Sequence, residues 1–161
     1  MKIRLRIPLK APGKNDLRPD PRITYMGRTP IPSAYLRWKG IEREWRRALD
    51  GMKPLPDQVA LGRRAVRFIR VMSSHERRMD RWNLEGGLNL VVVDMLVTLG
   101  WLVDDAEDCA EMLPAIQRRA TPDDLEPPST YIEIEDLPGP AVRTAELPGI
   151  LNVPLSPGGT R

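Results

Sequence analysis

The sequence predicts a mixed α/β (α+β) protein with a small mixed sheet, and two kinds of periodicity carry this prediction. Apolar residues alternate in residues 2–9 and again in the segment TYIEIEDL, which is typical of strands. Apolar residues recur at three- or four-residue spacing in residues 34–49, and a nearly continuous apolar run fills residues 84–100. These two segments predict a basic N-terminal helix and a long apolar helix.

The first strand and the segment after it are the most regular part of the pattern. Residues 2–9 place Ile3, Leu5, Ile7 and Leu9 on one face of a strand. Residues 10–32 hold Pro, Gly, Asn and Asp at many positions, so we expect a long loop, and long loops in compact domains are often functional.

The basic helix is expected from Ala34 to about Leu49, with Ser33 as its N-cap. Trp38, Ile41, Trp45 and Leu49 form an apolar stripe. The basic residues fall largely off that stripe: Arg37, Lys39, Arg43, Arg46 and Arg47.

A second strand is expected within residues 58–72, although its alternation is irregular and arginines crowd it. The polar, basic segment SSHERRMDR then predicts a loop.

The apolar helix over residues 84–100 begins with two glycines. Gly86 and Gly87 weaken its first turn by roughly 1 kcal/mol each relative to alanine, and glycines at a helix start often mark close approach by another backbone. Leu88 to Leu99 is apolar almost all round, so it must be buried on most sides. A small domain rarely encloses a helix so fully, and we therefore expect this helix at the interface of a homodimer.

The end of the chain divides into three expected parts. Asp105 is expected to cap a short helix that ends near Leu113, and TYIEIEDL to form the last strand. A single domain is then expected over residues 1–136, and a Pro/Gly-rich tail, extended or disordered, over residues 137–161.

Composition favours a cytoplasmic protein without a membrane partner. The single cysteine, Cys109, allows no internal disulfide and is more readily explained as a small core residue. The first ten residues lack the apolar run of a signal peptide, and Asp94 interrupts the longest apolar stretch.

Charge is distributed unevenly along the chain. Residues 1–81 contain 21 Lys and Arg against 8 Asp and Glu, a net charge of +13. Residues 82–161 contain 4 against 14, a net charge of −10. This asymmetry predicts a polyanionic partner for the first half and an acidic locus in the second. The alternative is two solvated surfaces that neutralise each other, for instance across a dimer.

Asp80, Asp104 and Asp105 are candidate ligands of a hard cation such as Mg²⁺, which supports phosphodiester hydrolysis. An Asp-Asp pair after a helix is, however, more often a turn and a helix cap. A helix over residues 84–100 is about 25 Å long, so Asp80 and Asp105 lie at opposite ends of it. They can share a metal only if the chain folds back or if an antiparallel helix of a second subunit lies alongside.

The order of these motifs resembles the RusA family of Holliday junction resolvases (crossover junction endodeoxyribonucleases), which are small dimeric endonucleases common in phages and prophages. The segments that carry the resemblance are IRLRIPLKAPGKND, GRTPIPSAYLRWKGIEREWRRAL, RFIRVM, DRWNLEGG, VVVDMLVTLGWLVDDAED and TYIEIEDL. They occur in the family's order and cover roughly residues 2–136.

The resemblance implies a Mg²⁺-dependent endonuclease, with Mn²⁺ as an alternative metal, that resolves Holliday junctions or other branched DNA in recombination and repair. Asp80 matches the first aspartate of the family's D-x-D-N-L element, Asn83 its asparagine, and Asp104 and Asp105 the late Asp-Asp pair. Trp82 stands where the second aspartate of D-x-D is expected, and no lysine occupies the following turn, where many members carry one.

Three interpretations of Trp82 remain open. Glu85, about one turn on, supplies the missing carboxylate; or the site works weakly with the three aspartates; or the protein binds branched DNA without cutting it. The indole itself either stacks on an unpaired base at a junction or packs in a dimer core or against the helix start.

The same resemblance gives the basic residues a role as DNA contacts, which position phosphates without reading sequence. These candidates are Arg37, Arg43, Arg46 and Arg47 on the basic helix, Arg77, Arg78 and Arg81 beside Asp80, and Lys14 and Asn15 in the loop. Alternatively, the arginines next to Asp80 form ion pairs with it, and Lys14 and Asn15 belong to an ordinary turn. A sequence-specific regulator would be a third class of function, but it requires a base-reading helix.

Overall fold

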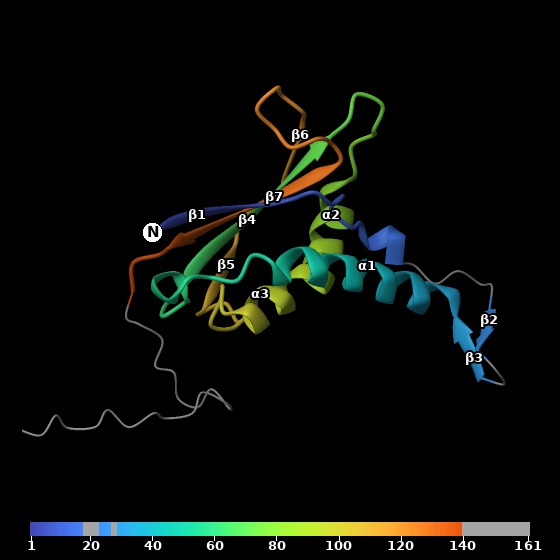
Figure 1. Cartoon of the computed structure of the whole chain (residues 1–161), viewed down its shortest axis with the longest axis horizontal. Coiled ribbons are helices and arrows are strands. Elements are labelled where there is room, and N and C mark those ends of the chain that lie inside the picture. Colours follow the sequence, from blue (N-terminus) through green and yellow to red (C-terminus); the bar gives the residue numbers. More distant parts are fainter. Residues whose placement is uncertain (18–22, 27–28, 140–161) are drawn as a thin grey trace, which may run out of the picture.

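A five-stranded mixed sheet forms the centre of the computed structural model, which describes residues 1–17, 23–26 and 29–139 (Figure 1). The strand order is β1 (Lys2–Ile7), β7 (Ser129–Asp136), β4 (Arg64–Met72) and β5 (Ala110–Met112), and β6 (Ile116–Arg119) also pairs with β4. β7 runs antiparallel to both β1 and β4, whereas β5 and β6 run parallel to β4. The mixed α and β architecture predicted from periodicity is therefore confirmed.

β4 is buried on both faces, and this explains its irregular alternation. Val66 and Phe68 face the main core, and their neighbours in register on β7 are Ile134 and Ile132. Ile69 and Val71 face the other side, where Tyr131 and Leu125 cover them. A strand that is covered on both faces reads as a nearly continuous apolar run.

Helix α1 (Ser33–Asp50) matches the predicted helix and packs its stripe on the main core. Trp45 and Leu49 are fully buried, and Trp38 and Ile41 are partly buried against them. Both α1 and the second helix lie on the same side of the sheet (Figure 1).

The second helix is continuous over residues 81–99 but changes its winding midway. It consists of α2 (Arg81–Leu88), a π-helical turn η3 (Asn89–Val93) and α3 (Asp94–Leu99). The wider turn places three consecutive valines, 91 to 93, in the core. Gly100 ends the helix in the left-handed conformation, with φ 86°.

This helix corrects one step of the dimer prediction. A single chain already buries Leu84, Leu88, Met95 and Leu96 together with the valines. The apolar run therefore does not require a second subunit, because α1 and the sheet cover it. The homodimer itself stays a prediction.

Two further expectations are wrong. Residues 10–32 are not one loop, since they contain a short 3₁₀ helix η1 (Lys14–Leu17) and a hairpin of β2 (Ile23–Met26) and β3 (Thr29–Pro32). Asp105 caps no helix: residues 105–109 form a bend and a turn, and β5 follows, because its backbone can pair with β4.

A short 3₁₀ turn, η2 (Pro56–Gln58), lies in the connection from α1 to β4. The predicted tail lies outside the described residues from residue 140 onward. No helix in the described ranges is long and apolar enough to cross a membrane.

Candidate nucleic-acid interface at the start of α2

The segment that follows β1 lies directly on α2, and the two glycines of α2 permit this contact. A Cβ atom on Gly87 would overlap the carbonyl oxygen of Pro12 and lie 2.7 Å from the carbonyl carbon of Gly13. A Cβ atom on Gly86 would lie 3.1 Å from Cδ of Lys14. The prediction of close backbone approach is therefore confirmed at Gly87, whereas Gly86 is approached by the Lys14 side chain, which lies beside the first turns of α2.

Asn83 connects this segment to Asp80. The backbone N–H of Asn15 donates to Oδ1 of Asn83 at 2.6 Å, and the backbone N–H of Asn83 donates to Oδ1 of Asp80 at 2.8 Å. Asp80 is thus the N-cap of α2, and its side chain remains exposed. The structure brings together four of the predicted site residues, Lys14, Asn15, Asp80 and Asn83.

The basic loop over residues 73–80 is fixed by a buried arginine on β4. The guanidinium of Arg70, only 2 % exposed, pairs with Glu76 at 3.0 Å and donates to the carbonyl of Arg77 at 3.3 Å. It also donates to Gln117 at 2.9 Å, and Gln117 holds both the N–H and the carbonyl of Met79.

Sequence reasoning missed Arg70 and Gln117. The available signal was an arginine inside an otherwise buried strand, because a buried charge requires partners. These two residues act on Asp80 indirectly, since they hold the backbone of the loop that leads into it.

The arginines of this loop do not pair with Asp80. Arg77 and Arg78 are exposed and form no ion pair within the described part of the chain, whereas Arg81 pairs with Glu85 at 2.7 Å. The expected ion pairs with Asp80 are therefore absent among the described residues, and two arginines remain available to an external anion.

The carboxylate of Glu85 is held by hydrogen bonds within the protein. The same oxygen that accepts from Arg81 also accepts from the backbone N–H of Ala115 at 3.0 Å. Glu85 thus ties the linker between β5 and β6 to α2, which makes it a poor replacement for a missing metal ligand.

Asp104 and Asp105 form a separate, exposed acidic pair beyond the other end of the long helix. The backbone N–H of Asp105 donates to Oδ1 of Asp104 at 2.7 Å. Hydrogen bonding between the two carboxyl groups raises the pKa of Asp105 and lowers that of Asp104, and the charge of Asp94 adds to the rise.

Asp80 and the pair of Asp104 and Asp105 are far apart in one chain. Residues 81–99 span about 28 Å at about 1.5 Å per residue, with Asp80 before this helix and the acidic pair after it. No group of three His, Cys, Asp or Glu side chains that could hold a metal occurs among the described residues. Asp80, Asp104, Asp105 and Glu85 thus do not form one metal site within a protomer.

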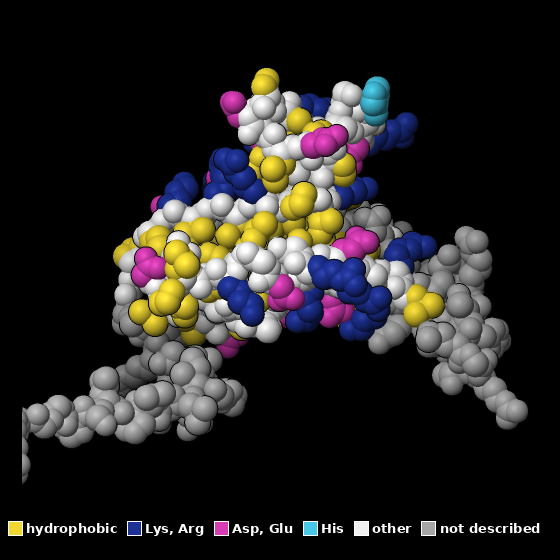
Figure 2. All heavy atoms as spheres, viewed as in Figure 1, with side chains coloured by type: hydrophobic (Ala, Val, Ile, Leu, Met, Phe, Trp, Pro, Cys, Tyr) yellow, Lys and Arg dark blue, Asp and Glu magenta, His cyan; other side chains and the backbone are white. Residues whose placement is uncertain are grey.

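The basic helix α1 is connected to α2 through the short helix η1. η1 packs against both α1 and α2, so it bridges the two helices. Figure 2 shows Lys and Arg side chains gathered over α1. Arg46 and Lys39 pair with Glu42, whereas Arg43 and Arg47 are exposed and form no ion pair with any described residue. Arg37 is also exposed.

Trp82 is the most exposed large apolar side chain described, at 82 %. It lies in the first turn of α2, two residues after Asp80. The prediction that its ring packs against the helix start is not met within a protomer, so the ring is displayed to a partner or to solvent.

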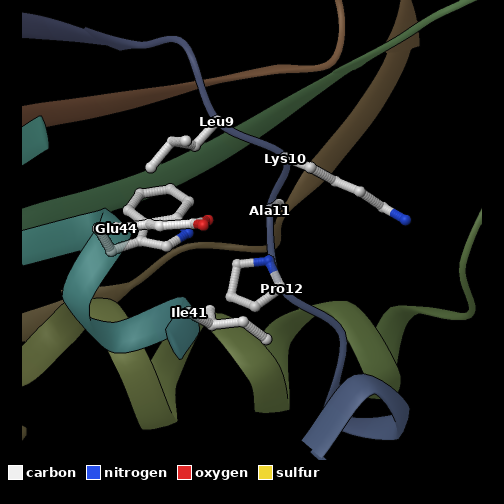
Figure 3. Close-up of a pocket in the computed structure, with 7 residues that line it drawn as sticks. Leu9, Lys10, Ala11, Pro12, Ile41 and Glu44 are labelled. Atoms are coloured by element: carbon white, nitrogen blue, oxygen red, sulfur yellow. The ribbon is translucent and has the colours of Figure 1, made fainter. Parts of the chain in front are cut away.

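A hollow of about 150 Å³ lies between α1 and the segment after β1 (Figure 3). Its lining is mainly apolar and includes Leu9, Pro12, Ile41 and Trp45, with Lys10 and Glu44 also contributing. None of the candidate aspartates lines it, so it is separate from the candidate site.

Comparison with known proteins gives no relative: no protein-family model matches this chain, and no curated protein matches it.

Proposed function

We propose that this protein is a RusA-like endonuclease that binds branched DNA, foremost four-way junctions, and nicks it as a homodimer with Mg²⁺ or Mn²⁺. The observation that carries the proposal is the cluster at the start of α2. There the segment of Lys14 and Asn15 meets Asp80, which caps α2, and its partner Asn83. Arg77 and Arg78, which form no ion pair with a described residue, lie just before them in the chain.

The electrostatics of this region suit a DNA backbone. Arg77 and Arg78 lie just before Asp80, and α1 carries the further exposed arginines Arg43 and Arg47. Contacts of this kind bind phosphates with an affinity that falls steeply with salt. A phosphodiester bound by these arginines would pass close to the exposed carboxylate of Asp80.

No three described carboxylates of one protomer gather into a metal site, and the long helix separates Asp80 from Asp104 and Asp105. We therefore infer that the site is composite, with Asp80 of one protomer facing Asp104 and Asp105 of the other across an antiparallel pair of long helices. Charge complementarity supports this arrangement, because each helix is preceded by arginines and followed by aspartates. Mg²⁺ would supply an activated water and neutralise the charge of the phosphate.

The first test uses a labelled four-way junction and a linear duplex of the same sequence, each with Mg²⁺, with Mn²⁺ or with EDTA. The proposal predicts paired nicks in the junction that require the metal and disappear in Asp105→Asn. Asp108→Asn is the matched control, since Asp108 is also exposed and carries the same charge. Equal nicking of the junction and the duplex would point to another class of DNA-binding protein.

Mixing two inactive variants tests the composite site. In a heterodimer of Asp80→Asn and Asp105→Asn, a composite arrangement leaves one site with both aspartates and the other with neither. The mixture would then regain nicking of one strand without paired cuts. If both aspartates of a site came from one protomer, every site in the mixture would lack one of them and activity would stay absent.

A second candidate function, binding of branched DNA without cleavage, is favoured by two observations. Trp82 cannot ligate a metal at the position of an expected aspartate, and Glu85 is engaged with Arg81 and Ala115. Junction-specific retardation without nicks would establish this alternative, and restored cleavage in Trp82→Asp would identify the indole as its cause.

A further inference from the structure

We infer that Trp82 is a stacking platform for an unpaired base, so that the preferred ligand is branched DNA with at least one unpaired nucleotide at the branch point. This inference rests on the proposed function and specifies its substrate class. It is drawn from the exposure of one indole and from the charges that surround it.

The indole is displayed by a rigid support. Trp82 lies in the first turn of a helix that Asp80 caps and whose next turns are fixed by the segment Pro12–Gly13–Lys14 against Gly86 and Gly87. The loop before it is held by the buried Arg70. Since the backbone on both sides is fixed, the 82 % exposed ring does not result from a loosely attached segment.

The surroundings select an anionic aromatic ligand. Basic side chains lie near the indole in the sequence and in the fold: Arg77 and Arg78 precede it in the chain, and Lys14 lies against Gly86, four residues further along α2. Nucleic acid supplies both complements, because phosphates pair with the cations and any base has a face that stacks on an aromatic ring. In a fully paired duplex the bases are stacked on each other, so only an unpaired base can reach the indole.

A second copy of this chain is the competing occupant, because Leu90 on the same helix is also exposed, at 56 %. The flat apolar face of the indole favours DNA at the Trp82 end. A partner helix in antiparallel register would bring its acidic end toward these arginines, but an aspartate pair offers no flat apolar face for the ring. The two occupants predict different behaviour of the same variant.

The test measures binding by fluorescence anisotropy in EDTA, so that cleavage plays no part. Three labelled junctions are compared: one fully paired, one with two unpaired nucleotides at the crossover, and one in which those nucleotides are abasic. The wild-type protein is expected to bind the unpaired junction more tightly than the abasic one by a factor between about 5 and about 150, the range that one stacked base supplies.

Trp82→Ala should bind all three junctions with the affinity that the wild-type protein has for the abasic one. Trp82→Phe should keep part of the preference for the unpaired junction. Leu90→Ala is the matched control and should keep all of it. Because Trp82 is exposed, its substitution should leave the fold intact, and circular dichroism of each variant checks this directly.

Three results would overturn the inference. An unchanged preference in Trp82→Ala excludes stacking while leaving the proposed endonuclease intact. A shift of Trp82→Ala to monomers in light scattering, with equal loss of affinity for every junction, assigns the ring to the dimer interface. Absence of binding to any junction removes the proposed function and this inference together.

Discussion

Gly87→Ala is the substitution that tests the architecture of the candidate site most directly. In the folded chain Gly87 is buried in α2, and the backbone of Pro12 and Gly13 passes over it. An added Cβ would overlap the carbonyl oxygen of Pro12 and lie 2.7 Å from two carbonyl carbons. These are backbone atoms, so no side-chain rotation relieves the overlap, and the segment that carries Lys14 must move away from α2.

The magnitude follows from two opposing effects. Overpacking of this kind costs about 1–3 kcal/mol, and more where backbone must move. Alanine in place of glycine in a helix returns about 1 kcal/mol. We expect a net loss of about 2 kcal/mol in the free energy of unfolding, which corresponds to a Tm lower by about 4–8 °C for a chain of this size.

Gly40→Ala is the matched control, because Gly40 lies in α1 and an added Cβ there meets nothing within 4 Å. It should gain up to about 1 kcal/mol. Urea unfolding followed by circular dichroism measures both variants, and junction binding should weaken only in Gly87→Ala. If Gly87→Ala were as stable as Gly40→Ala, the segment before η1 would not lie on α2, and the grouping of Lys14 and Asn15 with Asp80 would be refuted.

Three other predictions address the surroundings of the site. Arg70→Met should lower the free energy of unfolding by about 2 kcal/mol in urea titrations. Glu76 then loses its buried partner, and the basic loop loses the side chain that holds it. Arg118 holds the pKa of Asp124 well below its usual range, so the ionised Asp124 stabilises the fold above the unfolded-state pKa of about 4. That contribution is lost as the pH falls through the lower folded-state pKa, and the stability difference between the wild-type protein and Asp124→Asn, measured by urea unfolding from pH 7 to pH 2, should therefore shrink toward the acid end. Replacing Arg77 and Arg78 together by glutamine should reduce the slope of log affinity against log salt by about 2 on duplex arms, as anisotropy titrations at several salt concentrations would show.

The elements that the sequence predicts correctly are those whose burial is one-sided. In β1, Leu5 and Ile7 are buried and Lys2 and Arg4 are exposed, so the alternation is plain. The stripe of α1 is equally clear, because one face meets the core and the other meets solvent. β7 shows the same alternation in its C-terminal half.

Elements whose form depends on distant partners were not predictable in this way. β5 has only three residues, and its strand conformation comes from parallel pairing with Arg64–Val66. The acidic sequence around it resembles a helix start, but that local preference is overridden by the free edge of β4. The π-helical turn also has no local signal, since it is the packing of three adjacent valines that defines it.

The candidate site shows the same division between local and distant information. Asp80 as an N-cap and the glycines of α2 follow from short-range sequence, whereas Arg70 reaches the loop from the centre of the sheet. The separation of Asp80 from Asp105 also follows from simple geometry, because a straight helix keeps its ends apart. If both aspartates act on one phosphodiester, a second protomer must supply one of them. The oppositely charged ends of this helix are suited to that pairing, since an antiparallel partner sets arginines against aspartates at both ends at once.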